Sequence, residues 1–143
     1  MGHEDKGHYA QKHTGASLDP IISEKLKAAA EDGQITCSAA HRAANELGVS
    51  PLQIGIQTDL VEFRISKCQL GLFGYSTKKK KLDLELKISS QLHQALDDAS
   101  EDGRISCTRC WEIAKTLKCS KLELGSACEI KSIRIKPCQL GAF

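Results

Sequence analysis

The chain has 143 residues with a formal net charge of +2, and 41% of the residues are hydrophobic. No segment approaches the roughly 20 apolar residues of a membrane span, and the N-terminus lacks the apolar run of a secretory signal. We therefore expect a cytoplasmic protein that does not bind membranes. Seven cysteines in such a chain favour thiols or metal ligands over a disulfide framework.

The chain contains an internal duplication. The stretch from Glu31 to Phe73 returns as Glu101 to Phe143 at a constant offset of 70 residues, without insertion or deletion. Both copies begin Glu-Asp-Gly and end Cys-Gln-Leu-Gly-x-Phe. This period is too long for a solenoid repeat and suits one very small domain. We expect a disordered tail at residues 1–18, a module at 19–76, a connector at 77–88 and a second module at 89–143.

Each module is expected to begin with a helix that is followed by a short strand. Asp19 followed by Pro20 is a strong helix start, and Ser89 takes the capping position in the second copy. Apolar residues then recur at helical spacing, and an Asp-Gly pair in each copy ends the helix. The segments Gln34–Cys37 and Arg104–Cys107 predict brief strands.

Two further helices and a last strand complete each module. Ser38 and Thr108 are the expected caps of the second helix, and a turn at Leu47–Pro51 leads into the third. Alternation over Phe63–Cys68 predicts the last strand. In the connector, four lysines precede Leu82–Ile88, where Leu and Ile alternate with charged residues, so we expect an extra strand there.

The order helix, strand, helix, helix, strand, with the Leu-Gly-Val-Ser-Pro turn, resembles the winged helix-turn-helix superfamily. The resemblance implies a helix-rich α+β fold with two tandem winged-helix-like modules packed as a pseudo-dimer. The second copy departs from the turn, because Lys118, Cys119 and Lys121 occupy positions of Gly, Val and Pro in the first. The repeated Cys-Gln-Leu-Gly endings are also similar to those of uncharacterised bacterial proteins, a likeness that brings no function with it.

The resemblance implies a non-enzymatic regulator of transcription that binds double-stranded DNA, with the fused pair acting as an internal dimer. Lys and Arg would contact phosphates, and polar side chains of the third helices would read base edges. However, the third helix of the first module carries Asp59 and Glu62 and no basic residue. The candidate contacts are Gln53, Gln57, Lys121 and Ser126 on the third helices and Lys78, Lys79, Lys80 and Lys81 in the connector.

The cysteines suggest a different function. Cys37 and Cys68 recur as Cys107 and Cys138. If the strands pair, two thiols of each module lie near one sheet end, and two facing modules would supply four sulfurs for Zn or an iron–sulfur cluster. Cys110 adds a Cys-x-x-Cys motif. The alternatives are a metal- or redox-sensing regulator and buried structural thiols without any cofactor.

A third interpretation is a protein-interaction module that docks on an enzyme or assembly factor. Leu70, Phe73, Leu140 and Phe143 lie where each copy leaves its last strand, and they would be either exposed anchors or ordinary core residues. We find no Gly-rich phosphate loop and no candidate acid–base pair, and we therefore expect no enzymatic activity.

Overall fold

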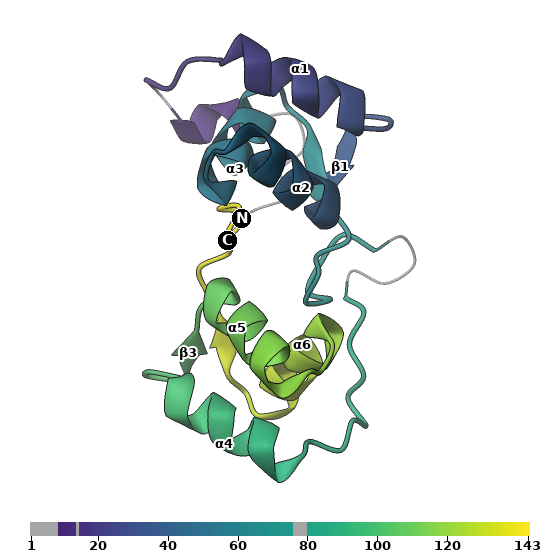
Figure 1. Ribbon diagram of the computed structural model, residues 1–143, viewed down its shortest axis with the longest axis vertical. Coiled ribbons are helices and arrows are strands. Elements are labelled where there is room, and N and C mark those ends of the chain that lie inside the picture. Colours follow the sequence, from purple (N-terminus) through teal and green to yellow (C-terminus); the bar gives the residue numbers. More distant parts are fainter. Residues whose placement is uncertain (1–8, 14, 76–79) are drawn as a thin grey trace. The chain divides into compact units, whose positions relative to one another are not determined.

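The computed structural model describes residues 9–13, 15–75 and 80–143, which fold into two compact units (Figure 1). Unit 1 comprises the chain up to Cys68 together with Leu140–Phe143, and unit 2 comprises Gln69–Gln139. The boundary therefore differs from the predicted modules, because the end of each copy belongs to the unit that contains the other copy's helices. The fold is α+β and rich in helix, as predicted.

The two units carry the same five elements in the same order, and this order is the predicted one. Unit 1 also contains a short 3-10 helix, η2 (Tyr9–His13). Its other elements are α1 (Pro20–Ala29), β1 (Gln34–Thr36), α2 (Cys37–Leu47), α3 (Pro51–Leu60) and β2 (Arg64–Ser66). Unit 2 contains α4 (Ser90–Ala99), β3 (Arg104–Ile105), α5 (Cys107–Leu117), α6 (Lys121–Ile130) and β4 (Arg134–Ile135).

Side-chain caps explain where the helices begin. The Asp19 carboxylate accepts hydrogen bonds from two amides of the first turn of α1, and Ser89 caps α4, as predicted. The expected caps of the second helices were wrong by two residues. Thr36 and Ser106 cap α2 and α5, because each hydroxyl accepts from the amide three residues on, and the helix then begins at a cysteine.

Each unit contains a two-stranded parallel sheet. β1 pairs with β2, with Gln34 opposite Arg64 and Thr36 opposite Ser66, and β3 pairs with β4 in the equivalent register. The extra strand expected in the connector is not formed over the described residues 80–88. Its amides bond elsewhere, since the Asp83 amide donates to the Ser126 hydroxyl at 2.8 Å and the Asp83 carboxylate accepts from the Glu85 amide in a turn.

The expected disorder of the tail is also wrong over part of its length. Residues 1–8 and 14 lie outside the described residues, but Tyr9 is only 4% exposed and η2 packs on α3. The amides of Tyr9 and Ala10 donate to the two carboxylate oxygens of Glu62, at 2.9 and 3.0 Å. His13 contacts the Asp59 carboxylate at 2.7 Å. These partners lie far away in the sequence, so local composition does not reveal them.

The third helix is the most buried helix of each unit. Five residues of α3 and five of α6 are buried, including the glycine near the middle of each helix. In unit 1, η2 covers part of α3, and the Leu140–Phe143 segment covers another part. In unit 2, Leu70, Gly71 and Leu82 lie against α6. α3 and α6 are therefore central core helices of their units.

Candidate functional site

The backbone of one short segment meets a glycine of α3 at very close range. A Cβ placed on Gly55 would lie 1.7 Å from the carbonyl oxygen of Leu140 and 2.7 Å from its carbonyl carbon. Ordinary contacts between a carbon and a carbonyl oxygen are about 3.3–3.6 Å, so only glycine permits this approach. Leu140 is buried beside it, and the next residue, Gly141, lies against Leu52. We call this site the Gly55 notch.

Unit 2 repeats the same arrangement. A Cβ on Gly125 of α6 would lie 1.8 Å from the carbonyl oxygen of Leu70, and Gly71 lies against the side chain of Leu122. Leu70 is completely buried. We call this site the Gly125 notch. Each notch thus holds a Leu-Gly pair, and in each case the pair follows the last strand of the other unit along the chain.

Two of the predicted base-reading side chains are engaged inside the protein. Gln57 is 8% exposed, and its amide group bonds the Asp19 amide at 2.9 Å and the Ser17 carbonyl at 3.1 Å. Ser126 is 2% exposed and accepts from Asp83. In this conformation neither side chain is available to a base edge, contrary to the role expected of them.

The predicted basic contacts also have internal partners. Lys121 stacks over the ring of Trp111 at 4.3 Å, and Lys81 lies 5.7 Å from the ring of Tyr75. Lys80 lies 3.5 Å from a carboxylate oxygen of Glu129. Lys78 and Lys79 fall outside the described residues. Of the candidates on α3, Gln53 is the one that is exposed to solvent.

All seven cysteines are thiols rather than disulfides. In unit 1 the duplicated pair, Cys37 and Cys68, follows the ends of two parallel strands, so the expected strand pairing and common sheet end are confirmed. Cys107 occupies the equivalent place in unit 2, and its sulfur accepts a hydrogen bond from the side chain of Gln139 at 3.4 Å. Among the described residues, no group of three or more His, Cys, Asp or Glu side chains is arranged to hold a metal ion.

Unit 2 has a second pair of thiols that unit 1 lacks. Cys110 of α5 and Cys128 of α6 are both buried, and Ala40 and Thr58 stand at the equivalent positions of unit 1. The hydrogen bond with Cys128, together with burial, raises the pKa of the Cys110 thiol. A buried thiol with a raised pKa is a poor nucleophile, because the thiolate is the reactive form. Cys110 therefore acts as a small core residue.

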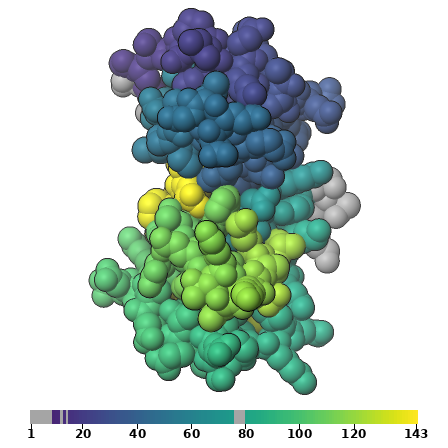
Figure 2. Space-filling view, in the orientation of Figure 1, coloured from purple at the N-terminus to yellow at the C-terminus, as the bar shows by residue number. Residues whose placement is uncertain are grey.

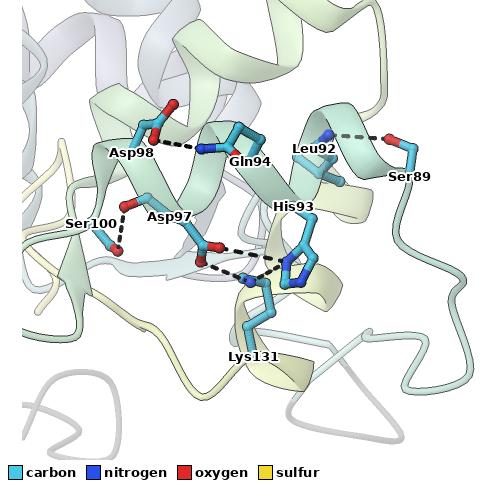
Figure 3. Close-up of polar contacts among 8 residues, drawn as sticks. All are labelled: Ser89, Leu92, His93, Gln94, Asp97, Asp98, Ser100 and Lys131. Atoms are coloured by element: carbon cyan, nitrogen blue, oxygen red, sulfur yellow. Dashed lines mark hydrogen bonds and ion pairs between the residues drawn. The ribbon is translucent and has the colours of Figure 1, made fainter.

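A charged cluster that the sequence analysis did not single out lies on α4 (Figure 3). The ammonium group of Lys131, at the end of α6, lies 2.9 Å from an Asp97 carboxylate oxygen and also contacts the ring of His93. The hydrogen bond from Lys131 holds the pKa of Asp97 below its usual value. Unit 1 has Ser23, Lys27 and Val61 at these positions, so the cluster belongs to unit 2 alone. It ties α4 to the end of α6.

An apolar groove runs along α1 and α2 of unit 1, and α1 lies at the molecular surface in Figure 2. Ile21 is 71% exposed, the highest value among the large hydrophobic side chains that are exposed. One part of the groove has a volume of about 580 Å³, and a smaller part of about 180 Å³ adjoins it. We call this surface the α1–α2 groove. Its lining residues are Pro20, Ile21, Glu24, Lys25, Ala28, Ala29, Ala39, Arg42, Ala43, Glu46 and Leu47.

The predicted interaction anchors lie elsewhere. Leu70 and Leu140 are buried in the two notches rather than exposed, and Phe73 and Phe143 are half-buried. The sequence did not reveal the α1–α2 groove, because Ile21 directly precedes Ile22. Ile22 faces the core, and two adjacent isoleucines do not show which of them is exposed. Comparing the copies gives the missing signal, since Gln91 and Asp98 replace Ile21 and Ala28 in the second module.

Comparison with known proteins identifies no relative: no protein-family model, no curated protein and no solved structure matches the chain. In the described part of the chain, no helix is long and apolar enough to cross a membrane.

Proposed function

We propose that this chain is a non-enzymatic protein-interaction module that docks an amphipathic helix of a partner protein in the α1–α2 groove. The observation that carries the proposal is the exposure of Ile21 in a groove whose lining includes four alanines. Two neighbouring helices with small residues between them accept a third helix, because its apolar face fits the depression at short interhelical distance.

The second module serves as an internal reference for this surface. The same fold places Ser90, Gln91, Asp98 and Arg109 where the groove has Pro20, Ile21, Ala28 and Ala39. The architecture therefore does not require apolar residues on this face. An apolar face on one copy and a polar face on the other supports a docking role for unit 1 alone.

Charges around the groove specify the partner further. Lys25 and Glu46 form an ion pair at 2.9 Å across the two helices, and Arg42 is exposed beside them. A fitting partner helix has an apolar stripe for Ile21 and the alanines, and an acidic residue placed for Arg42. Covering most of an isoleucine side chain is worth about 1–2 kcal/mol, or roughly tenfold in affinity.

The DNA-binding function that the fold resemblance suggested has less support. Sequence readout needs polar side chains that can enter the major groove, but Gln57 and Ser126 are buried. Among the described lysines that were candidates, Lys80, Lys81 and Lys121 have partners within the protein. The tandem winged-helix pseudo-dimer remains a proposal for the architecture. A metal- or redox-sensing role for the duplicated cysteines likewise remains a proposal, which elemental analysis after anaerobic purification would test.

A photo-crosslinking experiment tests the docking proposal. A photoreactive amino acid replaces Ile21 in the full chain, and the matched control carries it at Gln91, the equivalent position of unit 2. After irradiation in the native cell, we expect one dominant crosslinked partner from position 21 and none from position 91. The partner's crosslinked peptide should be an amphipathic helix.

Binding of the purified partner then gives the quantitative test. Ile21→Asp should weaken binding at least tenfold, whereas Gln91→Asp should leave it unchanged. Equal crosslinking from both positions, or an unchanged affinity of Ile21→Asp, would contradict the proposal. Binding of the chain to duplex DNA at low salt, with affinity that falls steeply as salt rises, would favour the DNA-binding function instead.

A further inference from the structure

We propose that the Gly55 notch is a docking site for a Leu-Gly segment supplied by another module, and that a second copy of this chain can fill it with its own Leu140–Phe143. The product would be a dimer in which the two chains exchange this segment. The inference concerns α3 and is independent of the α1–α2 groove.

The Leu140–Phe143 segment fits closely against α3. The Leu140 carbonyl lies directly against Gly55, Leu140 and Ala142 are buried, and Gly141 adopts a φ of +76° with Leu52 beside it. The left-handed φ favours glycine and lets the chain turn after the buried leucine. The notch therefore selects a segment by the conformation of its backbone and by one buried leucine side chain.

The same fit occurs in both units, with equivalent residues. In unit 2, Leu70 and Gly71 fill the Gly125 notch, Gly71 has a φ of +81°, and Leu122 takes the place of Leu52. Two independent units therefore bind a Leu-Gly pair in the same manner. The repetition marks the notch as a recognition site of this module.

The chain connectivity places each segment in the unit that does not contain the strand before it. Leu140–Phe143 follows β4 of unit 2 but belongs to unit 1, and Leu70 follows β2 of unit 1 but belongs to unit 2. In both cases, therefore, the Leu-Gly segment follows a strand of one unit along the chain and fills the notch of the other unit. The covalent connection holds the segment at a high effective concentration and favours closure within one chain. When closure is blocked, the same contacts can form between two chains, because exchange of identical elements needs no new interface.

Complementation between two variants of the full chain tests this inference. Gly55→Val fills the notch but leaves an intact segment, whereas Leu140→Asp spoils the segment but leaves an intact notch. In a 1:1 mixture, the segment of the first variant can enter the notch of the second. Native mass spectrometry, with one variant isotopically labelled, should show a heterodimer in the mixture and monomers of each variant alone.

The control mixture pairs Gly55→Val with a chain that carries both Gly55→Val and Leu140→Asp. Neither chain then offers an open Gly55 notch, so we expect at least a tenfold lower heterodimer fraction than in the test mixture. Absence of a heterodimer from the test mixture, or equal heterodimer in the control, would overturn the inference. If either variant fails to fold, the milder pair Gly55→Ala and Leu140→Ala gives the same test with the same two outcomes.

Discussion

The substitution Gly55→Ala tests the close approach of the Leu140 carbonyl to α3. The added methyl group would lie 1.7 Å from the carbonyl oxygen, so the segment must retreat by about 1.5 Å to reach an ordinary contact distance. The obstacle is backbone rather than the end of a flexible side chain, and it cannot rotate away. Overpacking of this kind costs about 1–3 kcal/mol.

Two other effects limit the destabilisation that Gly55→Ala can cause. Replacing glycine by alanine inside a helix favours the helix by about 1 kcal/mol. If the segment leaves the notch altogether, the loss is limited to the burial of Leu140, worth about 1.5–3 kcal/mol, and a smaller contribution from Ala142. Because the backbone obstacle cannot rotate away, we take the upper part of the overpacking range, about 2–3 kcal/mol. After the helix gain this leaves a net destabilisation of unit 1 of about 1–2 kcal/mol, which lowers its Tm by roughly 4–16 °C.

Thermal unfolding followed by far-UV circular dichroism measures the Tm, and hydrogen exchange of α3 assigns the loss to unit 1. Gln53→Ala, at an exposed position of the same helix, is the control and should change stability by less than about 0.5 kcal/mol. Gly125→Ala should reproduce the loss in unit 2. A Gly55→Ala protein as stable as the parent, or more stable, would refute the steric argument.

Three further outcomes are expected. Because the folded-state pKa of Asp97 is lowered by Lys131, the stabilisation is present above the unfolded value near 3.8 and is lost as the pH falls through the folded value. Asp97→Asn should remove this acid-range dependence in urea titrations followed by the single tryptophan. Gln57→Ala should lower the free energy of unfolding by about 1–2 kcal/mol, because it leaves two backbone groups without partners. Iodoacetamide should label half-exposed Cys138 before buried Cys110, and peptide mass spectrometry would show the reverse order if burial does not control reactivity.

Much of the fold was predictable from local signals. The helix starts are marked by capping residues such as Asp19 and Ser89, and the helices themselves by apolar residues at helical spacing. Both signals are local in the sequence. The connector shows the limit of this reasoning. Its alternating leucines predicted a strand, but alternation shows only which side chains could share one face, and Leu84 is 63% exposed. A strand also needs a backbone partner, and here the Asp83 amide bonds a serine side chain instead.

The candidate sites were less predictable, for a physical reason. Gly55 and Gly125 are visible as a repeated glycine, and the Leu-Gly endings are visible as a repeated segment. Because the two copies are alike, however, the sequence cannot tell which ending packs against which glycine. The burial of Gln57 likewise depends on Ser17 and Asp19, which lie far away in the chain. Long-range contacts of this kind determine which side chains are exposed to solvent, and therefore which side chains can contact a partner.

The assignment of Leu140–Phe143 to unit 1 has a consequence for synthesis on the ribosome. N-terminal domains usually fold first, while the chain grows at about 5–20 residues per second. Here the first unit must wait with an open notch on α3 until the whole of unit 2 has been made, which takes several seconds. During that interval the Leu-Gly segments within reach are the chain's own Leu70–Gly71 and those of neighbouring nascent chains. Polysome density on the message should therefore influence how often newly made chains pair instead of closing on themselves.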